Sequence, residues 1–233
     1  MMLAASACAS PPEPPPAEVA PTPAVAPAPE PPSSGRPRIV FLGDSLTAGY
    51  TLEEAEAFPA RTAELLAAAG QAVDVVNAGV SGDTSAGGLR RLAWLLRQKP
   101  DLLVVELGAN DGLRGLPLTA TEENLSRIVE QAQDSGAEVL LLGMQIPPNY
   151  GPEYSQGFAQ IFPRLAQEKG VELVPFLLEG VAGNPELNLP DGIHPTPEGH
   201  AIVAKTLLPY LERALSRLPS EPQPSQTAVT MEK

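Results

Sequence analysis

Five short apolar segments alternate with helical segments along the middle of the chain, and this alternation constrains the fold more than any other feature. We expect strands at residues 38–42, 73–76, 102–107, 139–142 and 171–174. Each segment is apolar almost throughout, which is typical of parallel strands whose two faces are both covered. The sequence therefore predicts a three-layer α/β/α sandwich around a five-stranded parallel sheet.

The segments between the strands carry helical spacing and recognisable helix ends. We expect helices at residues 53–69, 84–97, 121–135, 158–168 and 197–218. Gly70 and Gly170 follow two of them, as glycine often does at a helix C-terminus. Pro209 is expected to bend the last helix. The apolar side of the second helix should carry Leu89, Leu92, Trp94, Leu95 and Leu96.

Proline is concentrated before the first strand. The stretch from Pro11 to Pro37 holds 12 of the 28 prolines. Residues 11–35 therefore favour polyproline II and are predicted to form a disordered, semi-rigid linker. Residues 219–233 form a second polar stretch and are predicted to be a disordered tail. Residues 36–218 remain as a single domain of ordinary size.

The first ten residues contain the single cysteine of the chain, Cys8. Residues 1–10 resemble the end of a truncated bacterial lipoprotein signal, in which such a cysteine is lipidated after cleavage. This interpretation implies an exported protein, periplasmic or anchored to a membrane through Cys8. The segment has no basic start and its apolar run is short, so an N-terminus with a chance cysteine is the alternative.

The composition excludes several classes of protein. Lys plus Arg number 15 against 28 Asp plus Glu, and a net charge of −13 argues against nucleic-acid binding. One cysteine and two histidines exclude a disulfide framework and a Cys- or His-rich metal site. No apolar run approaches about 18 residues, so no membrane-spanning helix is expected. We expect no metal, no cofactor and a monomer.

Unusual polar residues gather in four blocks near the predicted strand ends and before the last helix. They are GDSLTAG at residues 43–49, NAGVSGD at 77–83, GANDG at 108–112 and DGIHP at 191–195. Parallel α/β sheets bind their ligands at the carboxyl ends of the strands. The four blocks are therefore expected to converge on one edge of the sheet.

In their order and positions, these blocks are similar to those of the SGNH (GDSL-type) hydrolase superfamily, which is named for a Ser, a Gly, an Asn and a His. The matching residues are Ser45, Gly79, Asn110 and His194. The strings VVNAGVSGDTS, VVELGANDGLRG and DGIHP resemble the bacterial branch that contains acyl-CoA thioesterase I, which also acts as a lysophospholipase and arylesterase. The resemblance spans about residues 38–218. It implies a flavodoxin-like SGNH hydrolase fold and an enzyme that hydrolyses acyl esters.

The blocks also supply the groups that acyl transfer requires. We expect Ser45 to be the nucleophile, His194 the base, and Asp191 the carboxylate that orients the imidazole. The oxyanion hole would use the backbone N–H groups of Ser45 and Gly79 and the side-chain amide of Asn110. Gly79 would let the backbone approach the substrate closely. These roles predict a serine esterase or thioesterase with an acyl-enzyme intermediate.

Four further polar residues are expected to be structural. Asp44 should hold the turn before Ser45 by accepting backbone N–H groups. Asp83 and Asp111 should tie neighbouring loops together in the same way. His200 lies in or near the last helix and is expected to have no direct part in catalysis.

Apolar residues after the third and fourth strands are candidates for the substrate groove. They are Leu113, Leu116, Ile146, Pro147 and Tyr150, with Arg114 as a candidate partner for a phosphate or carboxylate. Such a groove would take a small-molecule ester or thioester with a fatty acyl or aryl group. The alternative is that these residues only anchor their loops to the sheet.

Other functions remain open at this point. The same scaffold can host a carbohydrate O-deacetylase. A flavodoxin-like binding module would use the hydroxyl groups of Ser45, Thr47 and Thr51 to bind a phosphate. Flavin binding, however, usually requires aromatic side chains that stack on the ring, and the chain has one Trp. A catalytically silent cell-surface binding protein is the third alternative, and the intact set of four catalytic positions argues against it.

Overall fold

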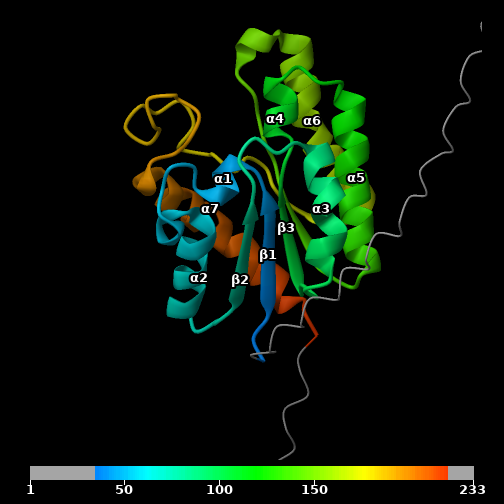
Figure 1. The fold of residues 1–233 in the computed structure, drawn as a ribbon, viewed down its shortest axis with the longest axis vertical. Helices are drawn as coiled ribbons and strands as arrows, with labels where there is room; N and C mark the ends of the chain where they lie inside the picture. Colours follow the sequence, from blue (N-terminus) through cyan, green and yellow to red (C-terminus); the bar gives the residue numbers. More distant parts are fainter. Residues whose placement is uncertain (1–34, 220–233) are drawn as a thin grey trace, which may run out of the picture. The chain divides into compact units, whose positions relative to one another are not determined.

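A computed structural model describes residues 35–219 and shows one parallel sheet with helices packed around it (Figure 1). The strand order is β2-β1-β3-β4-β5. The strands are β1 (Arg38–Gly43), β2 (Asp74–Gly79), β3 (Leu102–Glu106), β4 (Glu138–Leu142) and β5 (Glu172–Val174). The predicted five-stranded parallel sheet is confirmed, with small shifts at the strand ends. The predicted signal around Cys8, the linker up to residue 34 and the tail from residue 220 lie outside the described residues.

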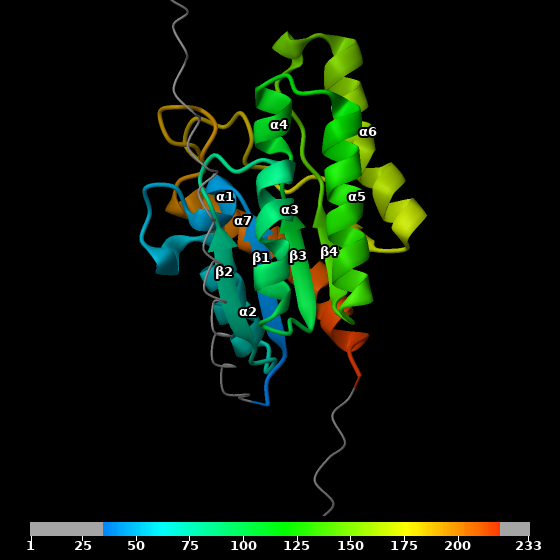
Figure 2. The same ribbon diagram turned by 45° about the vertical axis from the view of Figure 1, so that its right-hand side comes forward.

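Helices cover both faces of this sheet, which confirms the predicted three layers. They are α1 (Ser45–Ala48), α2 (Phe58–Ala68), α3 (Ser85–Leu96), α4 (Ala109–Leu113), α5 (Leu118–Asp134), α6 (Pro152–Lys169) and α7 (Pro197–Ser216), with 3-10 turns η1 (Glu54–Glu56) and η2 (Pro148–Tyr150). Helix α2 packs against α7, and α5 packs against α3 and α6. Figures 1 and 2 show these two groups on opposite faces of the sheet. None of the helices in residues 35–219 is a candidate for a membrane span.

Several predicted helix bounds are wrong. The helix expected at residues 53–69 is divided, because Ala57 is extended (φ −68°, ψ 148°) between η1 and α2. Helix α6 begins at Pro152 rather than Phe158, since proline is well suited to the first position of a helix. Helix α5 begins at Leu118, before the predicted Thr121. Helix α7 continues through Pro209 to Ser216.

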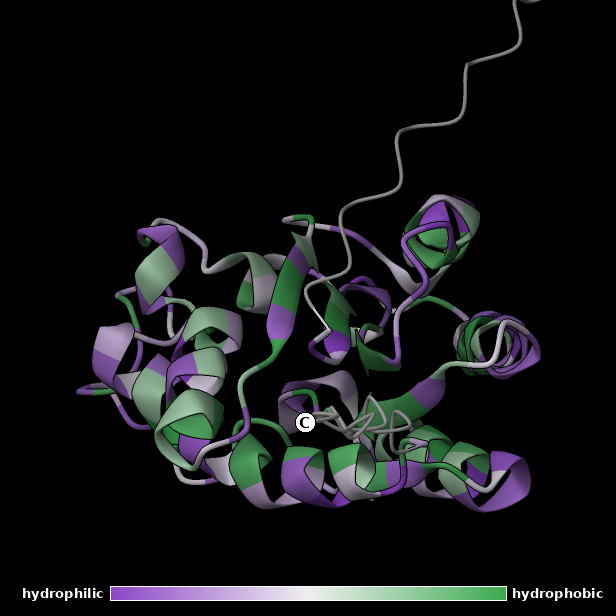
Figure 3. Ribbon diagram, turned by 90° about the horizontal axis from the view of Figure 1, so that it is seen from below, coloured by the Kyte–Doolittle hydropathy of each residue, from purple (hydrophilic) through white to green (hydrophobic). Residues whose placement is uncertain are grey.

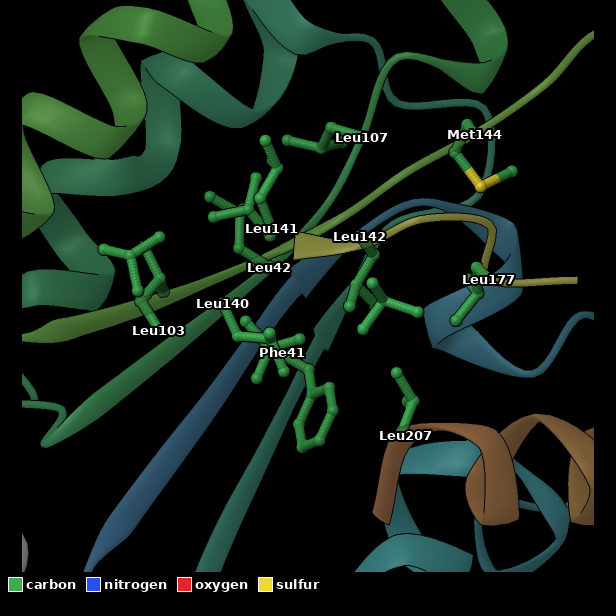
Figure 4. Close-up of a cluster of buried hydrophobic side chains, with 14 of the residues drawn as sticks. Phe41, Leu42, Leu103, Leu107, Leu140, Leu141, Leu142, Met144, Leu177 and Leu207 are labelled. Atoms are coloured by element: carbon green, nitrogen blue, oxygen red, sulfur yellow. The ribbon is translucent and has the colours of Figure 1, made fainter. Parts of the chain in front are cut away.

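The hydrophobic core lies between the sheet and the two helix layers. Figure 4 shows side chains of β1, β3 and β4 meeting there, among them Phe41, Leu103 and Leu140, which are fully buried. Viewed from below, the helices alternate between hydrophobic and hydrophilic residues, as amphipathic helices do (Figure 3). On α3, Leu92 is buried, whereas Trp94 is 54% exposed. The expectation for Trp94 was wrong because two residues rotate a helix by about 200°, away from the core side.

The carboxyl ends of three strands lie level with one another. Gly43 at the end of β1 is in register with Gly79 of β2 and with Glu106 of β3. The order of strands along the chain reverses between β1 and β3, which is where open α/β sheets bind their ligands. Helix α1 follows β1 and α4 follows β3 at this edge (Figure 1). The fold thus brings the first three of the predicted blocks to a common edge.

Candidate active site

Three polar side chains from distant parts of the chain form a continuous series of hydrogen bonds. Ser45 is the first residue of α1, directly after β1. Its Oγ lies 2.8 Å from Nε2 of His194, and Nδ1 of His194 lies 2.7 Å from Oδ2 of Asp191. This is the arrangement in which an imidazole accepts a proton from a serine while a carboxylate holds the ring.

The loop before α7 holds Asp191 for this contact. Its Oδ1 accepts the backbone N–H groups of Ile193 (2.9 Å) and His194 (3.0 Å), and Gly192 supplies the left-handed backbone (φ 70°) between them. Partial burial acts to raise the pKa of Asp191, but the hydrogen bonds from His194 and Ile193 outweigh it and lower the pKa to about 2. The carboxylate is therefore ionised at neutral pH and can accept the imidazole N–H.

The turn that carries Ser45 is fastened by buried carboxyl groups. Asp44 caps α1 by accepting the N–H of Leu46 (3.0 Å), which confirms its expected role, and its Oδ2 accepts Nδ2 of Asn110 (3.0 Å). Below it, Oε2 of Glu106 accepts the N–H of Asp44 (3.1 Å) and the hydroxyl of Thr47 (2.9 Å). Glu106 was not among the predicted site residues, although a charged residue at the end of the otherwise apolar strand β3 was a signal for it.

The three predicted oxyanion donors differ in whether their hydrogens are already used in hydrogen bonds. The N–H of Ser45 has no acceptor within residues 35–219, and Asn110 uses one of its two amide hydrogens on Asp44. The N–H of Gly79, in contrast, donates to Oδ1 of Asn77 at 3.0 Å. A Cβ at Gly79 would lie 2.2 Å from the backbone nitrogen of Ala48. Close packing against α1 thus explains the glycine at position 79.

Gly82 lies in the loop between β2 and α3 and has a left-handed backbone (φ 79°). Its carbonyl accepts Nη2 of Arg114 at 2.8 Å. Its N–H makes no hydrogen bond within the described part of the chain. Gly82 was not among the predicted site residues, although it stands in the same block as Gly79.

An apolar groove of about 520 Å³ opens beside Ser45 and Asn110. Its lining includes Leu113, Met144, Ile146, Pro147, Phe176 and Leu178. Of the predicted substrate-binding residues, Arg114, Leu116 and Tyr150 do not line this groove. The Tyr150 hydroxyl instead donates to the carbonyl of Leu113 at 2.8 Å, so Tyr150 anchors the loop that follows α4.

Other polar and aromatic residues surround the site. The Tyr50 ring, which was not predicted to belong to the site, lies over the His194 ring with centroids 4.4 Å apart. His200 is buried and its Nδ1 accepts the N–H of Phe58, which agrees with a structural role. Asp83 binds Arg91 and Asp111 binds Ser85, so both tie elements together as expected. No group of His, Cys, Asp and Glu residues in positions 35–219 is placed to hold a metal ion.

Comparisons with known proteins agree with this geometry. The model of the GDSL-like lipase/acylhydrolase family matches residues 41–202. An arylesterase of Vibrio mimicus is 43% identical over 184 residues, which cover 78% of this chain and 92% of that protein. Thioesterase 1/protease 1/lysophospholipase L1 of Escherichia coli K12 is 42% identical over 176 residues, covering 75% of this chain and 83% of that protein.

A solved crystal structure of TesA has the same fold. It is 42% identical to this chain, with a TM-score of 0.74, and the match covers 76% of this chain and 99% of the other. The predicted SGNH hydrolase fold is therefore confirmed. The family match spans most of the described domain, including Ser45 and His194. This chain accordingly belongs to the GDSL-like lipase/acylhydrolase family and is a serine ester hydrolase.

Proposed function

We propose that this enzyme hydrolyses carboxylic esters and thioesters with fatty acyl or aryl groups, using Ser45, His194 and Asp191 as its catalytic residues. The observation that carries this proposal is the series of hydrogen bonds from Ser45 through His194 to Asp191, beside an apolar groove. His194 takes the proton of Ser45 as Oγ attacks the carbonyl carbon, and Asp191 stabilises the imidazolium. His194 then protonates the leaving group, and an acyl-enzyme remains on Ser45. Water, activated by the same imidazole, releases the acid.

The negative charge that develops on the carbonyl oxygen requires hydrogen-bond donors. We infer that the Ser45 N–H and the second amide hydrogen of Asn110 supply two of them. For the third donor we propose Gly82 in place of Gly79. The N–H of Gly79 is already donated to Asn77, whereas that of Gly82 has no partner in residues 35–219. Arg114 fixes the next peptide by binding the carbonyl of Gly82.

The nucleophile is tested by Ser45→Ala, with Ser126→Ala as a control at a partly buried serine of α5 whose hydroxyl donates to Glu130. Ser45→Ala should lower kcat on p-nitrophenyl butyrate by about 10⁴-fold or more, because the triad works as a unit. A fluorophosphonate should label Ser45 in the wild type and in Ser126→Ala. Labelling of another residue, or turnover retained in Ser45→Ala, would refute the assignment.

A panel of substrates separates this proposal from carbohydrate O-deacetylation on the same scaffold. The groove beside Ser45 is lined by apolar side chains such as Met144, Ile146 and Leu178. Acyl esters, acyl thioesters and a lysophospholipid should therefore be hydrolysed with higher kcat/KM than an acetylated sugar. The reverse order would favour the deacetylase.

We also propose that the enzyme acts as an exported monomer that is held at a membrane through lipidated Cys8. Cys8 lies outside the described residues, and the support comes from its position before a proline-rich stretch. The wild type should partition into the detergent phase of a cloud-point extraction, and Cys8→Ser should remain in the aqueous phase. Aqueous partitioning of both proteins would count against lipidation. Sedimentation of the Cys8→Ser protein gives its oligomeric state.

A further inference from the structure

Glu106 is a completely buried carboxyl group beneath the active site that hydrolysis itself does not use. It is the last residue of β3 and is in register with Gly43, the residue before the nucleophile turn. Its Oε2 accepts two hydrogen bonds, from the N–H of Asp44 and the hydroxyl of Thr47. No described residue donates to its Oε1. Glutamate is rarely found fully buried without a charged partner.

The charged groups around Glu106 do not neutralise it. From the turn after β1, Asp44 is itself a buried carboxyl group. From α3, Arg91 directs its guanidinium to the carbonyls of Gly43 and Ala78 and to Asp83, and makes no hydrogen bond to Glu106. The charge of His194 acts on Asp44, where it lowers the pKa. A second negative charge in this place would therefore be buried and unpaired.

Only one of the two neighbouring carboxyl groups can be ionised in such a site. Asp44 accepts N–H groups at both of its oxygens, from Leu46 and Asn110, and is thus the better carboxylate. Burial raises the pKa of Glu106 well above its ordinary value, and the charge of Asp44 raises it further. Burial also raises the pKa of Asp44, but the N–H of Leu46 and the side chains of Glu106 and Asn110 offset part of this rise. Because Oε2 accepts two hydrogen bonds and Oε1 accepts none from the described residues, the proton of this pair belongs on Oε1 of Glu106.

We propose that Glu106 is a positioning residue whose protonated carboxyl group holds the turn that carries Ser45 and, through Asp44, orients the amide of Asn110. Its Oε2 fastens that turn at two points, at the backbone of Asp44 before Ser45 and at Thr47 after it. Its proton can be donated to the Asp44 carboxylate, which in turn accepts one hydrogen of Asn110 and leaves the other for the oxyanion. This role rests on the proposed function of Ser45 and Asn110.

The test compares Glu106→Gln with Glu106→Leu, and uses Glu123→Gln on the exposed surface of α5 as a control for replacing a glutamate by glutamine. Glutamine keeps an acceptor for Asp44 and Thr47 and supplies a neutral donor to the Asp44 carboxylate. Glu106→Gln should therefore retain kcat within about twofold. Glu106→Leu removes both acceptors and should lower kcat by about 10²-fold with little change in KM, because the reacting groups lose their alignment.

Infrared spectroscopy of the wild type provides a measurement that does not depend on activity or on the folding of the leucine variant. At neutral pH it should show the carbonyl stretch of a protonated carboxyl group, and this band should be missing in Glu106→Gln and present in Glu123→Gln. A band that persists in Glu106→Gln, or no band at all, would overturn the proposal.

The kinetic results can overturn it independently. If Glu106→Gln loses as much kcat as Glu106→Leu, the negative charge is needed and the carboxyl group is not neutral. Full kcat in a folded Glu106→Leu enzyme would show that Glu106 positions nothing. A wild-type enzyme that turns over no ester would count against the proposed function instead, and the infrared band would then decide alone whether Glu106 carries the proton.

Discussion

His200 should make this enzyme lose stability in mild acid. The side chain is 1% exposed, and its Nδ1 accepts the N–H of Phe58 at 3.2 Å. Its ring is also stacked on the Phe58 ring, with centroids 6.0 Å apart. Protonation would place a hydrogen on the nitrogen that now accepts one and would bury a positive charge. The native structure therefore favours the neutral imidazole.

The size of this loss of stability follows from the shift in the pKa of His200. Burial, and to a lesser degree the charge of His194, lowers the pKa of His200 from 6.5 to about 4. Below pH 6.5 the unfolded chain binds this proton before the folded one does, so the free energy of unfolding falls as the pH falls. The loss levels off below the folded-state pKa. With about 1.4 kcal/mol for each pKa unit, it reaches about 3 kcal/mol near pH 4.

The matched variant is His200→Asn, which carries no titrating group and keeps an acceptor near the position of Nδ1. Urea unfolding of both proteins at pH values between about 7 and 4 gives the free energy of unfolding at each pH. The variant is expected to be less stable at pH 7, since it leaves space beside Phe58. Its stability should nevertheless depend less on pH, with the two curves approaching each other by about 3 kcal/mol at acid pH. Parallel curves would refute the reasoning, because another group would then cause the acid loss.

The remaining predictions concern the oxyanion hole. Gly82→Ala should fold, since a Cβ there meets only Nη2 of Arg114 at 3.6 Å. Because Gly82 has a left-handed backbone (φ 79°), alanine should shift the loop and lower kcat about tenfold. Gly79→Ala should instead lower the free energy of unfolding by about 2–3 kcal/mol, because its Cβ overlaps the backbone of α1. Wild-type kcat in folded Gly82→Ala would argue against the Gly82 donor. Asn110→Ala should lower kcat by about 10²–10³-fold at nearly constant KM in steady-state assays. Asn110→Asp should be at least as damaging, and near-normal kcat in a folded Asn110→Ala enzyme would remove Asn110 from the site.

The sheet could be predicted from the sequence because each strand is a continuous apolar run between helical segments. Helix α4 could not. Asn110, Asp111 and Gly112 form a string that is typical of turns, yet they lie within α4. The oxygens of Asp111 accept the N–H and hydroxyl groups of Ser85 on α3, and this long-range contact holds α4 beside α3. Local residue preferences do not record such contacts.

Some residues of the candidate site could be predicted from the sequence and others could not. The side chains proposed for catalysis, Ser45, Asp191 and His194, could be selected from the sequence because acyl transfer requires such groups and their blocks are specific. The choice between Gly79 and Gly82 depends on which backbone N–H is already bonded, and that depends on the neighbouring Asn77 side chain. Tyr50 is brought to His194 only by folding. Sequence patterns identify reactive groups more readily than the contacts that surround them.

Both ends of the described domain lie at the edge of the sheet opposite to Ser45. Arg38 begins β1 there, and Arg217, just after α7, pairs with Glu138 and Glu172 at the starts of β4 and β5. The six residues of β1 separate that edge from Ser45 by about 20 Å. Attachment to a bead, an electrode or a fusion partner through either end would therefore leave the mouth of the groove facing outward. The domain is suited to immobilisation without loss of access for bulky substrates.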